Sequence, residues 1–456
     1  MVLRFLTLIF VSVAVLLPQT SALMAQTLAI QDVYVLSMET DQVLDHQTII
    51  VKNGLIQWVG NAESAEVPDN AMVVTGNFYV MPGLAEMHAH IPQPGQGEQA
   101  MKDALMLYLS QGITTIRGML GHPAHLELRE QAAAGEIDSP RIFTSGPSFS
   151  GGSVDSPEQA RQMVRQQVEA GYDLLKFHPG LTVEEFRAIT GEANSYGIEF
   201  SGHISHDVGL ERSLNAGQGT IDHLDRYMEF LAGDPEDRDD PNIIFFGYDL
   251  ADEVDESRIE LAARLTEQAG VWNVPTHTLL HNVFNPDLSV ERMRNWPGME
   301  YISESTLENW SGYVQNLRAT EDYDADKARR FLDIRDKMLL ALHETGAGLM
   351  LGADAPQIFN PPGFSAHREL NLLVEAGLTP FEALKTGTVN VSSYLNETGR
   401  AGIIVPGARA DLLLLDANPL ETIPFQDHIK GVVSAGKYYD REMLDQLLLQ
   451  VKNRLD

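Results

Sequence analysis

The middle of the chain alternates short apolar runs with longer amphipathic stretches. The apolar runs have the length and composition of buried strands, and the stretches between them have the spacing of helices. Strands that alternate with helices predict an α/β fold, here a closed (β/α)8 TIM-like barrel over residues 81–400. The predicted strands are residues 83–87, 113–117, 142–145, 174–177, 198–202, 220–223, 271–275 and 348–351.

Capping residues support the helices of this prediction. Ser156-Pro157 is followed by Gln159, which predicts an N-cap, a proline in the first turn and a capping box. The same device recurs at Thr182 with Glu185 and at Thr379-Pro380 with Glu382. Glycines stand where the helices should end, at Gly171, Gly197 and Gly217.

Both ends of the chain have the alternating pattern of β-structure. Residues 26–80 contain two apolar runs separated by Asn53-Gly54, which is a strong hairpin signal. Residues 401–456 contain further short apolar runs next to Pro406-Gly407 and Gly436. Because chain termini often lie close together, we expect the two ends to form one small β-sandwich domain.

Two connections are longer than a barrel requires. Residues 228–270 carry an acidic run at 234–240, and residues 282–335 carry several aromatic residues. Both follow predicted strands and would emerge where barrel active sites lie, so they are candidates for a lid. Packing decoration and an oligomer contact are equally good explanations, and a homo-oligomer stays open.

The first residues resemble a secretory signal. Arg4 precedes an apolar segment, residues 5–17, which is too short to span a membrane comfortably. Pro18 ends this segment, and Ala22 and Ala25 offer cleavage points. We therefore expect residues 1–25 to be removed near Ala25 and the protein to be secreted or periplasmic. The alternative, an uncleaved anchor, is less favoured, because no stop-transfer pattern follows.

Charge and cysteine content exclude several classes of function. The 456 residues have a formal net charge of −32 and a pI near 4.7, which argues against nucleic-acid binding and against anionic membranes as partners. The chain has no cysteine, so disulfides, thiolate metal sites and cysteine nucleophiles are excluded. A metal would have to be held by histidine, carboxylate or modified lysine.

The candidate chemistry lies at the ends of the predicted strands. His88 and His90 close the first strand and, one residue apart, would face the same way and could hold one divalent ion. The C-terminal ends of barrel strands converge on one face, where catalytic groups lie. Further strands end in Lys176, His203, His223 and Asp354.

This set resembles the ligand pattern of the amidohydrolase superfamily, and the resemblance covers the whole mature chain. The nearest likeness is to imidazolonepropionase-like enzymes and secreted dipeptidases that act on Xaa-Pro or basic dipeptides. Residues 410–412, 416–419 and 112–117 also resemble that branch. The substrate would therefore be a small molecule.

The resemblance implies a centre with two metal ions. Lys176, which burial would keep neutral, would take up carbon dioxide as a carbamate and bridge both ions. His88, His90 and Asp354 would complete one site, and His203 and His223 the other. The ions would generate hydroxide near neutral pH, with Asp354 transferring the proton to the leaving amine. Zinc is the default, and these ligands also suit manganese, cobalt or iron.

Two residues are candidates for contact with the substrate. Tyr227 resembles a substrate-contacting tyrosine of the dipeptidase branch, and His277 follows the seventh predicted strand. Many relatives carry Gly-Gly-His after strand three, whereas this chain has Ser153 after Gly151-Gly152, which weakens the dipeptidase assignment.

These expectations lead to three hypotheses. The first is an amidohydrolase that cleaves a C–N bond of a dipeptide, N-acyl amino acid, amide or cyclic imide-like ring. The second is a hydrolase of lactones, esters or organophosphate-type compounds on the same metal centre. The third is a metal-loaded barrel that binds its ligand without catalysis.

Overall fold

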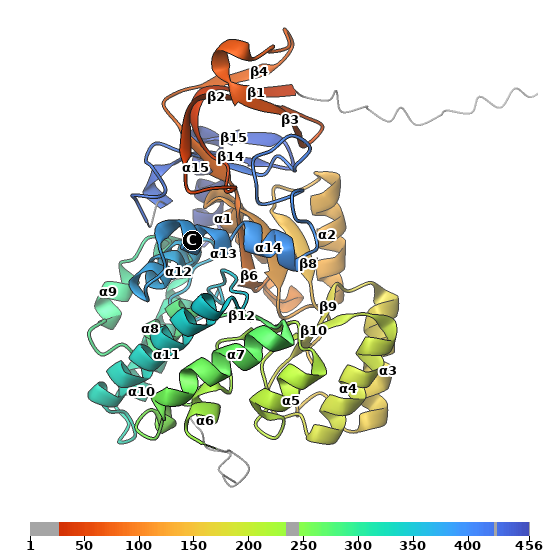
Figure 1. Ribbon diagram of the computed structural model, residues 1–456, viewed down its shortest axis with the longest axis vertical. Helices are drawn as coiled ribbons and strands as arrows, with labels where there is room; N and C mark the ends of the chain where they lie inside the picture. Colours follow the sequence, from red (N-terminus) through yellow and green to blue (C-terminus); the bar gives the residue numbers. More distant parts are fainter. Residues whose placement is uncertain (1–26, 234–245, 424–425, 456) are drawn as a thin grey trace, which may run out of the picture.

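The computed structural model describes residues 27–233, 246–423 and 426–455. Over these ranges the chain has a mixed α/β fold in two parts (Figure 1). A sheet built from both ends of the chain stands above a larger body of strands and helices. The predicted signal sequence, residues 1–25, lies outside the described residues, and so does the acidic run 234–240.

The upper sheet joins the two ends of the chain. Its strands follow the order β15-β14-β13-β5-β1-β2-β3, with β4 paired to β1. Strand β5 is parallel to β1 and antiparallel to β13, which confirms the predicted pairing of the two ends, while a sandwich stays a prediction. The bounds are β1 Thr27–Leu36, β2 Val43–Lys52, β3 Leu55–Asn61, β4 Met72–Thr75, β5 Tyr79–Pro82, β13 Leu412–Leu415, β14 Ile429–Ser434 and β15 Lys437–Asp440.

The predicted hairpin connects β2 to β3. Lys52 pairs with Leu55, and Asn53 and Gly54 have φ values of 55° and 73°. Two left-handed residues in a row make the turn for which Asn-Gly is preferred. A Cβ atom on Gly54 would lie 2.9 Å from the carbonyl oxygen of Ala435, so the N-terminal hairpin packs directly against a C-terminal turn.

Gly54→Ala should therefore destabilise the protein by more than its backbone angle alone explains. A left-handed alanine costs about 1 kcal/mol, and the contact with Ala435 adds to this cost. Gly135→Ala is the matched control, because Gly135 has a φ of 71° and nothing within 4 Å of its Cβ position. Thermal unfolding should show the larger drop in Tm for Gly54→Ala, and equal drops would contradict the predicted contact.

The strands of the body form two parallel sheets, β6-β7-β8 and β12-β11-β10-β9. An isolated parallel bridge between Ser145 and Leu174 links the edge strands β8 and β9. These strands confirm seven of the eight predicted strands, with ends shifted by a residue or two. Their bounds are β6 Leu84–Ala89, β7 Ile113–Gly118, β8 Arg141–Thr144, β9 Leu174–Phe177, β10 Glu199–Gly202, β11 Thr220–Asp222 and β12 Trp272–Val274.

The eighth predicted strand, residues 348–351, differs from the prediction. It forms only an isolated bridge, between Leu349 and Asn273 of β12. On its other side Met87 donates its N–H to Leu351, but the N–H of Leu351 donates to Thr386. Because this N–H bonds outside the neighbouring strands, no regular ladder forms, although the segment still lies between β12 and β6.

The helices surround the strands of the body (Figure 1). Thr182 and Thr379 form the predicted capping boxes with Glu185 and Glu382. Ser156 caps its helix as predicted, but the side chain of Gln159 accepts from Asp155, so no box closes there. The bounds are α1 Glu98–Ser110, α2 Pro123–Ala134, α3 Pro157–Ala170, α4 Val183–Tyr196, α5 Gly209–Ala216, α6 Tyr227–Leu231, α7 Ile259–Ala269, α8 His277–Phe284, α9 Val290–Arg294, α10 Glu304–Arg318, α11 Ala325–Thr345, α12 Phe364–Glu375, α13 Pro380–Thr386, α14 Val389–Tyr394 and α15 Arg441–Lys452.

The two long connections are helical in the described ranges. Residues 228–270 contribute most of α6 and all of α7, and residues 282–335 contribute α9, α10 and parts of α8 and α11. Helix α11 buries Phe331, Met338 and Leu339 in the main apolar core. A lid role for either connection stays a prediction. Every helix in the described part of the chain is too short or too polar to cross a membrane.

Candidate metal centre

His88 and His90 converge on one carboxylate. The Nε2 atom of His90 lies 2.7 Å from Oδ1 of Asp354, and Nε2 of His88 lies 3.6 Å from the same oxygen. One ligand atom from each of the three residues lies within 4.8 Å of the other two. This group could hold a metal ion, since two imidazoles and a carboxylate are suitable ligands.

The backbone around this group is irregular. The pairing of β6 with β7 shifts register between Glu86 and Ala89, so simple alternation along the strand does not hold there. Asp354 has a φ of 59°, and its N–H donates to the carbonyl of His88 at 3.1 Å. A left-handed conformation is unfavourable for aspartate and persists where the surroundings fix it, as they often do at functional sites.

Lys176 comes from the end of β9 and is completely buried. Its Nζ atom lies 3.6 Å from Oδ2 of Asp222, and it has no hydrogen-bond partner among the described residues. Burial lowers the pKa of Lys176, although the carboxylates of Asp222 and Asp354 oppose this effect. A buried amine without a hydrogen bond is costly, which suggests a further chemical partner at this position.

His203 and His223 follow β10 and β11, the next two strands of the sheet that contains β9. Their ring centroids are 4.5 Å apart, and the ring of His223 is also 4.5 Å from that of His88. The Nδ1 atom of His223 lies 3.9 Å from Oδ2 of Asp354. The structure therefore brings all six predicted ligands to one place, while their role in metal binding stays a prediction.

Three of the histidines place their Nδ1 atom against a polar side chain. Nδ1 of His203 is hydrogen-bonded to Asp225 at 2.9 Å, and Nδ1 of His223 to Thr276 at 2.8 Å. Nδ1 of His88 lies 2.8 Å from Oδ2 of Asp222. Each contact leaves Nε2 for a metal and fixes the ring orientation, which is the usual arrangement around bound metals.

Two of the predicted histidine ligands are in the protonation state that binds a divalent ion. Burial lowers the pKa of His88 well below its usual value, and nearby Lys176 lowers it further. Burial likewise lowers the pKa of His223, with His203 and His88 adding to the effect. Neutral imidazoles are the form that binds metals, and the buried Nε2 of His223 has no hydrogen-bond partner among the described residues.

Two buried arginines donate hydrogen bonds to backbone carbonyls near the predicted ligands, and one of them also donates to Asp222. Arg117 donates to the carbonyl of Met87 at 2.8 Å and to Oδ1 of Asp222 at 3.4 Å. Arg335, which comes from α11, donates to the carbonyl of His223 at 2.8 Å and to that of Pro275 at 3.1 Å. These contacts tie the strand ends together, so the positions of His88 and His223 depend on residues far away in the sequence.

Asp225→Ala should weaken metal binding without unfolding the chain. The carboxylate holds Nδ1 of His203 and also accepts the N–H of Ile204 at 3.1 Å. Loss of such a partner typically costs about 10–100-fold in metal affinity. Competition with a chelating dye measures this change. The control is Asp207→Ala, because Asp207 is an exposed carboxylate in the loop between β10 and α5, which also contains His203. Equal affinities in both variants would contradict the predicted role.

The predicted substrate residues lie away from a free surface. Tyr227 is buried, and its hydroxyl is hydrogen-bonded to Thr266 at 2.8 Å and to Asn273 at 3.0 Å. His277 is completely buried, with Nε2 3.2 Å from Oδ1 of Asp336. These placements favour packing roles, and a substrate contact by either residue stays a prediction.

Ser153, in the loop after β8, forms hydrogen bonds within that loop. Oγ of Ser153 donates to the carbonyl of Ser148 at 2.8 Å and accepts the N–H of Ser150 at 2.9 Å. His178, which follows β9, lies beside a predicted ligand, with its ring centroid 5.1 Å from that of His203. Burial and the charges of Lys176 and His203 lower the pKa of His178 to about 2, so the ring is neutral.

Three residues that hold the predicted ligands were not among the sequence predictions. Asp222, Asp225 and Thr276 are each within three residues of a predicted ligand or strand end. The run Asp-His-Leu-Asp at 222–225 was a usable signal, since carboxylates commonly orient metal-binding histidines. Arg117 and Arg335 gave no such signal, because their contacts depend on the three-dimensional arrangement.

This chain is similar in sequence to known proteins. The sequence profile of the amidohydrolase family matches residues 79–438. The imidazolonepropionase of Bacillus cereus is 23% identical over 419 residues, which cover 88% of this chain and 90% of that protein. The imidazolonepropionase of Rubrobacter xylanophilus is 37% identical over 114 residues, 23% of this chain, and the match spans only about a quarter (26%) of that relative.

Solved structures show the same fold. The crystal structure of a Xaa-Pro dipeptidase with methionine bound in its active site superposes with a TM-score of 0.67. The alignment covers 91% of this chain and 100% of that chain, at 19% sequence identity. At this identity the likeness establishes the shared fold alone.

Proposed function

This chain belongs to the amidohydrolase family and is accordingly a hydrolase of carbon–nitrogen bonds, and on that premise we propose a two-metal enzyme that cleaves a small amide. The match bears out the family resemblance that the sequence predicts. The bond type follows from the family, whereas the two-metal centre and the substrate are proposals.

One observation carries the proposal. His88, His90 and Asp354 place their ligand atoms within 4.8 Å of one another, and the buried Nζ of Lys176 beside them has no hydrogen-bond partner among the described residues. The ion pair with Asp222 at 3.6 Å leaves this missing hydrogen bond unexplained, because burying an amine without a hydrogen bond is unfavourable. A ligand role for a modified Lys176 removes this cost.

The strands that hold these residues are proposed to close into a (β/α)8 barrel. Isolated bridges support closure at both gaps: Ser145 pairs with Leu174, and the segment after Gly348 contacts β12 through Asn273 and β6 through Ala89. The barrel would occupy residues 81–400, between two halves of a β-sandwich domain at 26–80 and 401–456. The ligands would then lie at the C-terminal ends of its strands.

We further propose that Lys176 carries a carbamate. The neutral amine would attack carbon dioxide, form a new C–N bond and release one proton, which leaves a carboxylate-like group with two oxygens. His88, His90 and Asp354 would hold one ion, and His203 and His223 the second, with the carbamate between them. Zinc fits these nitrogen and oxygen donors, and manganese, cobalt and iron fit them too.

Ions bound here would lower the pKa of a water molecule and polarise the scissile carbonyl. The chain's own residues then position the reaction. Asp354, held by His88 through its backbone and by His90 through its side chain, is placed to accept the proton of the attacking water. It would return this proton to the leaving amine, as general acid–base catalysis requires.

The favoured substrates are dipeptides and N-acyl amino acids, with small cyclic amides next. A dipeptide suits the fold shared with the Xaa-Pro dipeptidase, and a cyclic amide suits the sequence match to imidazolonepropionases. We also propose that residues 1–25 direct export and are removed near Ala25.

The test uses the mature chain, without residues 1–25, loaded with zinc and checked for metal content. The metal-loaded protein is assayed against dipeptides, N-acyl amino acids, cyclic amides, lactones and organophosphate esters. Turnover of an amide supports the proposal. Turnover restricted to lactones or phosphate esters contradicts it, and so does a protein that binds two metals and hydrolyses no compound of the panel.

A further inference from the structure

His178 lies beside the predicted metal ligands without being one of them. It follows Lys176 by two residues, and its ring stacks on that of His203 with 5.1 Å between centroids and 29° between planes. The side chain is only partly buried. Its ring therefore lies directly against a predicted ligand, and the six predicted ligand positions belong to other residues.

The backbone on either side fixes the position of this ring. The N–H of His178 donates to the carbonyl of Phe149 at 2.8 Å, and the N–H of Phe149 donates to the carbonyl of Lys176 at 2.8 Å. A bridge between Phe149 and Phe177 joins the same two segments. A side chain on such a rigid support is prepared for binding, since little freedom is lost when a ligand arrives.

One ring nitrogen of His178 forms no hydrogen bond within the described part of the chain. Its Nδ1 atom is shielded from solvent and has no hydrogen-bond partner there. Buried polar atoms nearly always have a partner, and an exception at a functional centre calls for an explanation. The adjacent loop does not supply a partner, because the hydroxyl of Ser153 is hydrogen-bonded to Ser148 and Ser150.

We propose that His178 hydrogen-bonds, through its imidazole, to a carbonyl or carboxylate oxygen of an amide substrate bound at the centre. This inference rests on the proposed function and narrows it to amides that carry a second oxygen near the scissile bond, as dipeptides and N-acyl amino acids do. A neutral imidazole has one N–H, which would donate the hydrogen bond, and the carbonyl or carboxylate oxygen would accept it.

Two replacements separate hydrogen bonding from stacking. His178→Phe keeps a flat ring against His203 and removes both nitrogens, whereas His178→Gln keeps polar atoms and loses the ring. With the best substrate of the panel, we expect kcat/KM of His178→Phe to fall about 10–100-fold, mainly through KM. His178→Gln should recover part of the loss, and both variants should keep the wild-type metal content.

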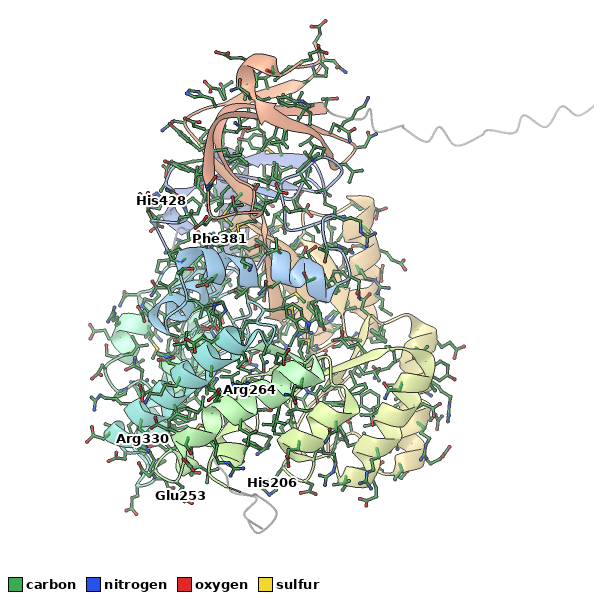
Figure 2. The ribbon with its side chains drawn as sticks, viewed as in Figure 1. His206, Glu253, Arg264, Arg330, Phe381 and His428 are labelled. Carbon is green, nitrogen blue, oxygen red and sulfur yellow. The ribbon has the colours of Figure 1, made fainter. Side chains whose placement is uncertain are left out.

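His206→Phe is the matched control, because His206 follows the neighbouring strand β10 and lies at the end of the molecule farthest from the upper sheet (Figure 2). Wild-type kcat/KM in His178→Phe would overturn the inference, as would a loss that accompanies loss of metal. An inactive wild-type protein would instead overturn the proposed function and this inference together, so the two failures are distinguishable.

Discussion

Replacing Lys176 with alanine should abolish hydrolysis and remove one of two bound metal ions. The side chain is completely buried, and its Nζ atom lies 3.6 Å from Oδ2 of Asp222. Metal ions stabilise charge in the transition state by several kcal/mol, so we expect kcat/KM to fall by about 10³-fold or more. Metal analysis of the purified variant, with kcat/KM for the best substrate, measures both effects.

The control for this variant is Lys337→Ala on α11. Lys337 is partly exposed and pairs with Glu256 and Asp333 at the surface, so its loss should leave metal content and turnover unchanged. Added acetate should restore part of the activity of Lys176→Ala, because it can supply two carboxylate oxygens in the space that the side chain leaves. Two tightly bound ions and full turnover in Lys176→Ala would contradict the bridging role.

Asp354→Asn should lower kcat by about 10²–10⁴-fold, the range typical of general acid–base groups. Asparagine keeps the shape of the side chain, and the backbone N–H of residue 354 can still donate to His88. The amide cannot accept the proton of the attacking water, and it loses the charge that lies 2.7 Å from His90. Steady-state kinetics at saturating zinc separates the loss of proton transfer from weaker metal binding.

Asp287→Asn is the matched control for this second prediction. Asp287 is an exposed carboxylate that pairs with Arg329, far in the sequence from any predicted ligand. Its replacement should leave kcat within the error of the measurement. An Asp354→Asn variant with wild-type kcat would show that the proton passes through another group.

Much of the fold could be predicted because its elements are local. The apolar run that ends at Lys176 and the Asn53-Gly54 turn both form as the sequence predicts. Residues 348–351 do not form a regular strand, because the N–H of Leu351 bonds to Thr386 instead of a neighbouring strand. A hydrophobic pattern predicts which residues are buried. It does not predict which carbonyl accepts the hydrogen bond of each backbone N–H.

Part of the candidate site could be predicted from the sequence, and part of it could not. The six predicted ligands stand at strand ends, so their approach follows from the parallel arrangement of the strands. Tyr227 resembles a substrate-contacting tyrosine of the dipeptidase branch, and its contact with substrate stays a prediction. Arg226 adopts a left-handed conformation with a φ of 66°, and Tyr227 begins α6 with its hydroxyl buried against Thr266. Sequence distance does not encode such a change of direction.

We propose that two metal ions at this centre are needed for hydrolysis of an amide. The most direct test removes metal from the mature chain with a chelator and titrates zinc back in the presence of bicarbonate, while amide hydrolysis is followed. We predict that activity is absent without metal and reaches its maximum at two ions per chain. Full activity without metal, or a maximum at one ion per chain, would contradict the claim.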